Sequence, residues 1–120
     1  MNVAISGVLV ALIWLGTLAN AQAQRYSVTD LGTLGGGSST GYAINASGQV
    51  TGEAVTAGGT LHAFLYSNHV MRDLNSLIDP ALVVYVTLDS GKAINDDAWI
   101  VANGVDSRSG KTHAYLLSKQ

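Results

Sequence analysis

A pattern that returns after fifty residues constrains the fold of this chain more than any other feature. The triplet Ala-Ile-Asn at 43–45 recurs at 93–95. The segment His-Ala-Phe-Leu at 62–65 recurs as His-Ala-Tyr-Leu at 113–116, one residue later because the second copy carries a one-residue insertion. Self-similarity at a fixed period is the signature of repeat architectures. These matches predict two copies of one structural unit.

A second match supports the same conclusion. Residues 29–34 read Thr-Asp-Leu-Gly-Thr-Leu and resemble residues 72–77, which read Arg-Asp-Leu-Asn-Ser-Leu. Two independent matches in the same order indicate an internal duplication. We expect a two-copy β-repeat domain over residues 24–120, with units of about 26–74 and 75–120.

Short apolar segments separated by turn residues predict antiparallel strands in each unit. The first unit has a strand at 41–44, a turn at 45–48 in which Gly48 can take a positive φ, and strands at 49–56, 62–66 and 70–74. Four antiparallel strands at this spacing predict an all-β fold of propeller-blade-like meanders. A small β-sandwich is the alternative.

The second unit repeats this pattern at 92–94, 99–105 and 112–117 and then lacks a fourth strand. Residues 26–31 resemble a fourth strand without preceding partners and are candidates to fill that gap. Small residues on the two inner strands would let another sheet approach closely; they are Gly52, Ala54, Ala102 and Gly104. Two blades do not close a propeller, so we expect either a homo-oligomer or a marginally stable, shortened relative of longer repeat proteins.

The N-terminal segment is typical of a secretory signal peptide. Residues 3–19 are apolar and uncharged, and the small-residue site Ala21-Gln22-Ala23 follows them. We expect a signal-peptide helix within residues 1–23, cleavage before Gln24, and a secreted protein, either periplasmic or extracellular. The alternative is an uncleaved anchor helix, since the apolar run has the minimum spanning length.

Charge and cysteine content exclude several functions. Six Lys and Arg residues stand against eight Asp and Glu residues, a balance that offers no attraction for nucleic acid or, after signal cleavage, for an anionic membrane. The chain has no cysteine, which excludes disulfides, thiolate catalysis, Cys-ligated metals and a lipid anchor on cysteine.

Three segments together carry a family resemblance: Val-Thr-Asp-Leu-Gly-Thr-Leu-Gly-Gly at 28–36, Tyr-Ala-Ile-Asn-Ala-Ser-Gly-Gln-Val-Thr-Gly at 42–52, and His-Ala-Phe-Leu-Tyr at 62–66. They resemble the HAF family of bacterial extracellular repeat proteins, named for its His-Ala-Phe triplet, and the resemblance extends over residues 26–118. It implies export and a repeated, propeller-like β architecture, and it supplies no catalytic residues.

The second copy departs from this pattern at two places. Ala98 stands where the turn glycine is expected, which predicts a costly backbone conformation at Asp97 or Ala98. Tyr115 replaces the phenylalanine of the triplet.

Each candidate for chemistry has a structural explanation that we prefer. His62 and His113 are repeat equivalents, which favours structural hydrogen bonds over metal ligation. Acidic residues gather at Asp89, Asp96 and Asp97, but their spacing does not fit an EF-hand and such residues favour turns. The segment 35–39, Gly-Gly-Gly-Ser-Ser, lacks the residues of a phosphate loop and is interpreted as a flexible connector.

We therefore predict no catalytic, cofactor-binding or metal-binding residues, and no enzyme. The residues expected to carry the repeat structurally are Asn45, Gly48, Gly52, His62, Phe64, Asn95, His113 and Tyr115. The favoured function is a structural or protein-interaction module with an extracellular protein or glycan as partner. The alternative is a carbohydrate-binding, lectin-like protein that uses Trp99, which replaces Gln49 of the first copy and is expected to point outward.

Overall fold

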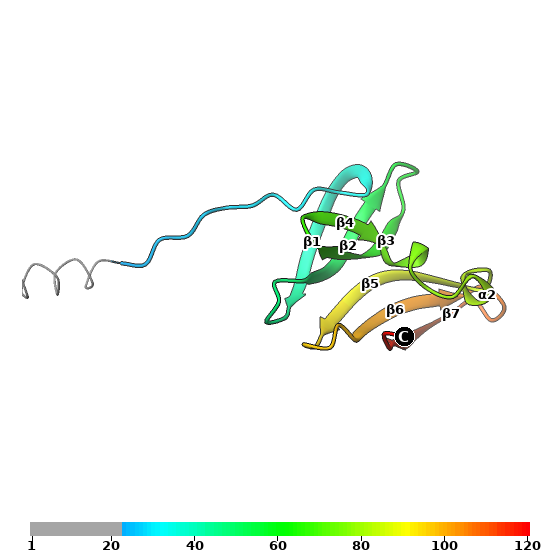
Figure 1. Cartoon of the computed structure of the whole chain (residues 1–120). Helices are drawn as coiled ribbons and strands as arrows, with labels where there is room; N and C mark the ends of the chain where they lie inside the picture. The colour runs from blue at the N-terminus through cyan, green and yellow to red at the C-terminus, as the bar shows by residue number, and fades with distance from the viewer. Residues whose placement is uncertain (1–22) are drawn as a thin grey trace, which may run out of the picture.

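The computed structural model describes residues 23–120, which form two antiparallel β-sheets (Figure 1). The first sheet has the order β1-β2-β3-β4, with β1 at Gly35–Ile44, β2 at Val50–Thr56, β3 at Leu61–Ser67 and β4 at Val70–Asp73. The second has the order β5-β6-β7, with β5 at Val86–Ile94, β6 at Ile100–Asp106 and β7 at Lys111–Leu117. The predicted β class and antiparallel pairing are confirmed, whereas the predicted signal peptide lies, except for Ala23, outside the described residues.

The first two strands of each sheet are joined by the same kind of turn. Asn45 donates its backbone N–H to the carbonyl of Gln49 at 3.1 Å, and Asn95 donates to the carbonyl of Trp99 at 3.0 Å. The Asn45 side-chain oxygen accepts the N–H groups of Ser47 and Gln49 at 3.1 and 3.0 Å. An asparagine that bonds its own backbone two residues later stabilises a turn without help from the rest of the fold.

The last residue of each of these two turns has a left-handed backbone. Gly48 has a φ of 78°, and Ala98 has a φ of 63° at the equivalent position. Glycine adopts this region freely, but the Cβ of alanine makes it unfavourable. The costly conformation predicted for the second turn is therefore found, at Ala98.

We expect Ala98→Gly to raise the free energy of unfolding by about 1 kcal/mol, because it removes the Cβ from a left-handed residue. Urea unfolding followed by circular dichroism measures the change. The reverse substitution in the first turn, Gly48→Ala, should lower stability by a similar amount. A loss of stability in Ala98→Gly would show that the side chain contributes more than the backbone strain costs.

The first and second strands of each sheet also share an irregularity. The register of β1 on β2 shifts at Tyr42, and the register of β5 on β6 shifts at Lys92. Such an extra residue bends its strand and increases the local twist. The two sheets thus have the same local geometry just before their turns.

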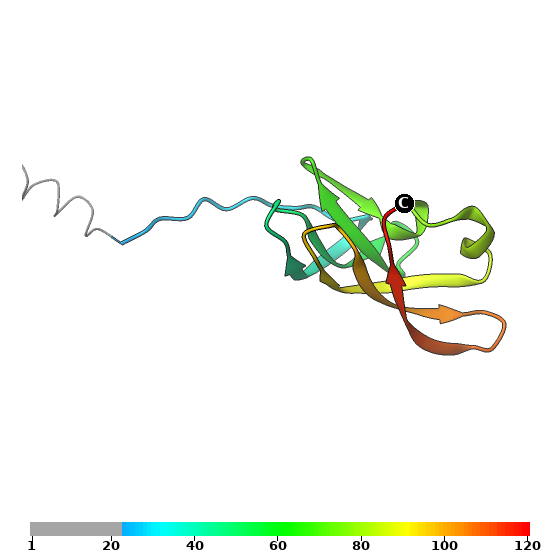
Figure 2. The same cartoon turned by 60° about the horizontal axis from the view of Figure 1, so that its bottom comes forward.

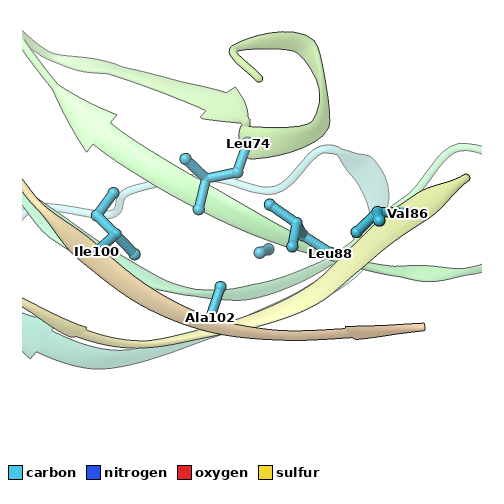
Figure 3. Close-up of a cluster of buried hydrophobic side chains, with 6 residues drawn as sticks. Leu74, Val86, Leu88, Ile100 and Ala102 are labelled. Carbon is cyan, nitrogen blue, oxygen red and sulfur yellow. The ribbon is translucent and has the colours of Figure 1, made fainter. Parts of the chain in front are cut away.

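The core lies between the two sheets, where one face of the second sheet covers β3 and the turn after β4 (Figure 3). Its buried members are Ala63, Leu74, Val86, Leu88, Ile100 and Ala102, with Leu65, Ile78, Ile94, Tyr115 and Leu117 partly buried around them. Figure 3 shows Leu74 pointing toward Leu88, Ile100 and Ala102 from the opposite side. Burial of these side chains stabilises the contact between the sheets.

Strand β5 makes the closest approach between the sheets. A Cβ placed on Gly91 would overlap the Oγ1 of Thr51 and would lie 3.3 Å from the backbone N of Gly52. Only glycine leaves room for two backbones at this distance. Gly52 is one of the small residues expected to let another sheet approach closely. A Cβ on Gly52 would instead meet the carbonyl of Thr40, so the small size of Gly52 serves pairing within the first sheet.

The connection between the sheets covers the free edge of β5. It contains the short helical turns η1 (Leu74–Ser76) and α2 (Pro80–Val83). The Asn75 side chain donates to the carbonyl of Leu88 at 2.9 Å and accepts its N–H at 2.7 Å. The Asn75 side chain therefore forms the two backbone hydrogen bonds that a neighbouring strand would form with Leu88, and another strand cannot pair with Leu88 there.

Two expectations about the N-terminal part of the domain are wrong. The segment 35–39 is not a flexible connector but the first half of β1, because a Cβ on Gly36 would overlap Val55 and the glycine run lets β1 lie close against β2. Residues 26–31 do not complete the second sheet. They form an arm that leaves the first sheet and points away from β7 (Figures 1 and 2).

The arm starts from a base that is held by the first sheet. Leu34 forms an isolated parallel bridge with Thr56, and the carbonyl of Gly32 accepts the hydroxyl of Ser39 at 2.6 Å. Beyond this base, the exposed fractions of Tyr26 and Val28 are 83% and 96%. The second sheet therefore has three strands among the described residues.

Candidate functional site

The two Asn-initiated turns lie against each other and join residues that are fifty positions apart. The Asn45 side-chain nitrogen donates to the carbonyl of Asn95 at 2.9 Å, and the N–H of Ala46 donates to the Asp96 carboxylate at 2.9 Å. The Asn95 side chain is occupied with its own turn, since its oxygen accepts the N–H groups of Asp97 and Trp99. The contact between the turns is thus asymmetric, with Asn45 as the bridging side chain.

A polar hollow of about 430 Å³ lies beside these turns. It is lined by Ser47, Gly48, Gln49, Ser67, Asn68, Asp96, Asp97, Ala98 and Lys119. Of the acidic residues noted in the sequence, Asp96 and Asp97 reach this hollow and Asp89 does not. Within residues 23–120, no three His, Asp or Glu side chains gather in a way that could hold a metal ion.

A larger open groove, of about 910 Å³, lies between the sheets and contains Asp89. Tyr42 and Lys92, where the strand register shifts, contact each other beside this groove. The Lys92 ammonium lies 4.4 Å from the centre of the Tyr42 ring, and the Tyr42 hydroxyl donates to Glu53 at 2.9 Å. This hydrogen bond raises the pKa of Tyr42, because only the protonated phenol can donate it. Glu53 and Lys92 are therefore engaged by the same aromatic side chain.

His62 and His113 have different surroundings. His62 Nδ1 lies 2.6 Å from the Asp73 carboxylate, which also accepts the N–H of Asn75 at 2.9 Å. His113 is exposed, lies beside the Tyr115 ring, and has no carboxylate within salt-bridge distance in the part of the chain that the structure describes. Among residues 23–120, the structural hydrogen bond expected of both histidines is present at His62 and absent at His113.

The third strands of the two sheets pair in the same register, which makes their faces comparable. Thr51 pairs with Leu65 in the first sheet, and Val101 pairs with Leu116 in the second. Phe64 is opposite Gly52, as Tyr115 is opposite Ala102. Each position of one face therefore has a defined counterpart in the other sheet.

The same face is buried in the first sheet and open in the second. Thr51 and Ala63 are fully buried, and Leu65 packs against the core beneath the second sheet. Their counterparts are open: the exposed fractions of Val101 and Leu116 are 40% and 63%, and Ala114 is exposed. We call these residues, together with the neighbouring Trp99 and Val105, the outer face: Trp99, Val101, Val105, Ala114 and Leu116.

Trp99 lies at the turn end of the outer face and has an exposed fraction of 42%. Its counterpart Gln49 accepts the Asn45 amide at 2.7 Å and donates to the Ser67 hydroxyl at 3.1 Å. The second sheet therefore has a half-exposed indole where the first sheet has an amide that ties the turn to β3. Trp99 lines neither the polar hollow nor the groove.

Sequence reasoning missed the residues that organise this region. The outer face was not recognised, because Val101, Val105 and Leu116 look like ordinary strand residues until their counterparts are seen to be covered. Asp73 and Asn75 were noted only as part of the match between residues 29–34 and 72–77. That match was the available signal for the His62–Asp73 pair.

Comparisons with protein-family models, curated proteins and solved structures found no match for this chain. Residues 23–120 contain no helix that is both long enough and apolar enough to cross a membrane.

We expect Asn45→Ala to lower the free energy of unfolding by about 1–3 kcal/mol, because it removes three part-buried hydrogen bonds, two within its own turn and one to the other turn. Asn95→Ala should cost less, since its side chain serves only its own, exposed turn. Urea unfolding of both variants measures the difference. Equal losses would mean that the contact between the turns contributes no stability.

Proposed function

We propose that this chain is a secreted, non-catalytic member of the HAF family that acts as a structural or protein-interaction module through the outer face of its second sheet. The supporting observation is that this apolar face is open, although Thr51 and Ala63, the counterparts of Val101 and Ala114, are fully buried and Leu65, the counterpart of Leu116, packs against the core. An open apolar face of this kind is typical of a surface that binds another protein.

The pairing pattern supports two copies of one propeller-blade-like unit. Both sheets share the turn, the register shift before it and the register of the third strand. The contact between the units is one-directional. Thr51 of the first unit lies against Gly91 of the second, whereas Val101, the counterpart of Thr51 in the second unit, is open. A one-directional contact leaves one unsatisfied face for a further partner.

The polar side chains near the hollow and the groove support a non-catalytic role. His62 is paired with Asp73, Glu53 with Tyr42, and Asp96 with the backbone of Ala46. Each of these bonds connects strands or turns, so each has a structural purpose. Export rests on the sequence of residues 1–23, which predicts a location in the periplasm or outside the cell.

Leu116→Asp should reduce binding of extracellular partner proteins at least tenfold, because it places a charge at the most exposed large side chain of the outer face. The measurement is affinity capture of extracellular proteins from the producing bacterium by the immobilised chain, with captured amounts compared between variants.

The matched control is Ile44→Asp, which changes an aliphatic side chain with an exposed fraction of 68% outside the outer face. The control should retain the partners of the wild-type chain. If both variants or neither lose them, the outer face is not the binding surface.

Carbohydrate binding is the second candidate, because the half-exposed Trp99 indole offers a flat apolar surface to a sugar ring. If this function is correct, a glycan screen should shift the tryptophan emission of the chain, and calorimetry should find no binding of the same glycan to Trp99→Leu. If no glycan in the screen shifts the tryptophan emission, carbohydrate binding is rejected and the protein-interaction function remains.

A further inference from the structure

The second sheet lacks the strand that covers the corresponding edge of the first sheet. In the first sheet, β4 pairs with β3, and Phe64 is opposite Asp73. The counterpart of β3 is β7, which pairs only with β6 among the described residues. The hydroxyl of Tyr115 on this strand is buried and has no hydrogen-bond partner within residues 23–120. An unpaired edge offers backbone N–H and C=O groups to an added strand.

The N-terminal arm has the sequence of the missing strand. Residues 29–34 match residues 72–77, which places Asp30 at the position of Asp73. The two aspartates also make the same local bond: Asp30 accepts the N–H of Gly32 at 2.9 Å, and Asp73 accepts the N–H of Asn75 at 2.9 Å. The arm thus shares the aspartate bond with which β4 enters η1, although the backbone then differs, since Gly32 has a φ of 89° and Asn75 lies in the helical turn η1. Among residues 23–120, no strand pairs with residues 26–31.

The different surroundings of His62 and His113 indicate which contact the arm would add to β7. His62 is held by the carboxylate of Asp73, whereas its counterpart His113 is exposed and lacks such a partner in the described part of the chain. Asp30 is the residue that the match assigns to this role. Leu31 corresponds in the same way to Leu74, which is buried in the core.

We propose that residues 26–31 of one copy add to β7 of a second copy as its fourth antiparallel strand. The pairing of β3 with β4 sets the register: Asp30 lies opposite Tyr115, Thr29 opposite Leu116, and Val28 opposite Leu117. This proposal rests on the proposed interaction function and names its partner as the chain itself.

The arm reaches a second copy rather than its own second sheet because of where its base is held. Leu34 and Gly32 are fixed to the first sheet, at Thr56 and Ser39, and the arm extends from there away from β7 (Figures 1 and 2). The exposed Tyr26 and Val28 are then free to contact another molecule. On the free edge of β5, the backbone N–H and carbonyl of Leu88 are already bonded to the Asn75 side chain.

Cysteine cross-linking between two chains tests the register, because the natural chain has no cysteine. One full chain carries Thr29→Cys and the other Leu116→Cys, and the mixture is oxidised mildly and separated without reductant. A second mixture pairs Val28→Cys with Leu117→Cys, since directly opposite residues alternate between close and wider pairs and one mixture will contain the close pair. The control mixture pairs Val28→Cys with Thr112→Cys, which is five residues out of register.

We expect at least one matched mixture to form about ten times more disulfide-linked dimer than the control mixture. Equal cross-linking in all three mixtures would overturn the proposal. So would a disulfide that forms only when both cysteines are in one chain, because the arm would then close its own second sheet.

The native mass of the purified wild-type chain provides a second measurement. Light scattering after size exclusion should show a discrete assembly of two or more copies, and a monomer at every concentration would contradict the proposal. The cross-linking and mass measurements follow pairing between copies of the chain, whereas the capture experiment follows binding of other proteins. If the cross-linking and mass measurements fail while capture of other proteins is retained, self-pairing is wrong and the interaction function stands.

Discussion

The structure depends on the close contact of β5 with the face of the first sheet. Gly91 brings the β5 backbone against Thr51, and the apolar side chains on either side of this contact form the core. A side chain at Gly91 would separate the two sheets and open that core. The bridge from Asn45 to Asn95 and the cover of β5 by Asn75 both require this distance between the sheets.

The same contact explains why the molecule has unsatisfied surfaces. It uses one face of the first sheet and the opposite face of the second, so the counterpart of the buried Thr51 face stays open at Val101 and Leu116. Within residues 23–120, the second sheet therefore has an open face and an unpaired edge at β7. The proposed partner binding and the proposed strand exchange use these two features separately.

Much of the fold could be predicted from local sequence. Asn45 and Gly48 mark a turn because their preferred conformations are local, and the fifty-residue match then located the second turn at Asn95 and Ala98. The glycine run at 35–39 was misjudged, because the same residues that permit flexibility also permit a strand to lie close against β2. Nothing local distinguishes these two outcomes.

The β class, the order of turns and strands, and the strain at Ala98 follow from local sequence, because they depend on the preferences of neighbouring residues. The burial of the Thr51 face, the exposure of the Val101 face and the separation of residues 26–31 from β7 depend instead on how the two sheets pack. Equivalent sequences have equivalent local structure, but burial depends on which unit lies next to which. That neighbour is set by packing between segments far apart in the chain.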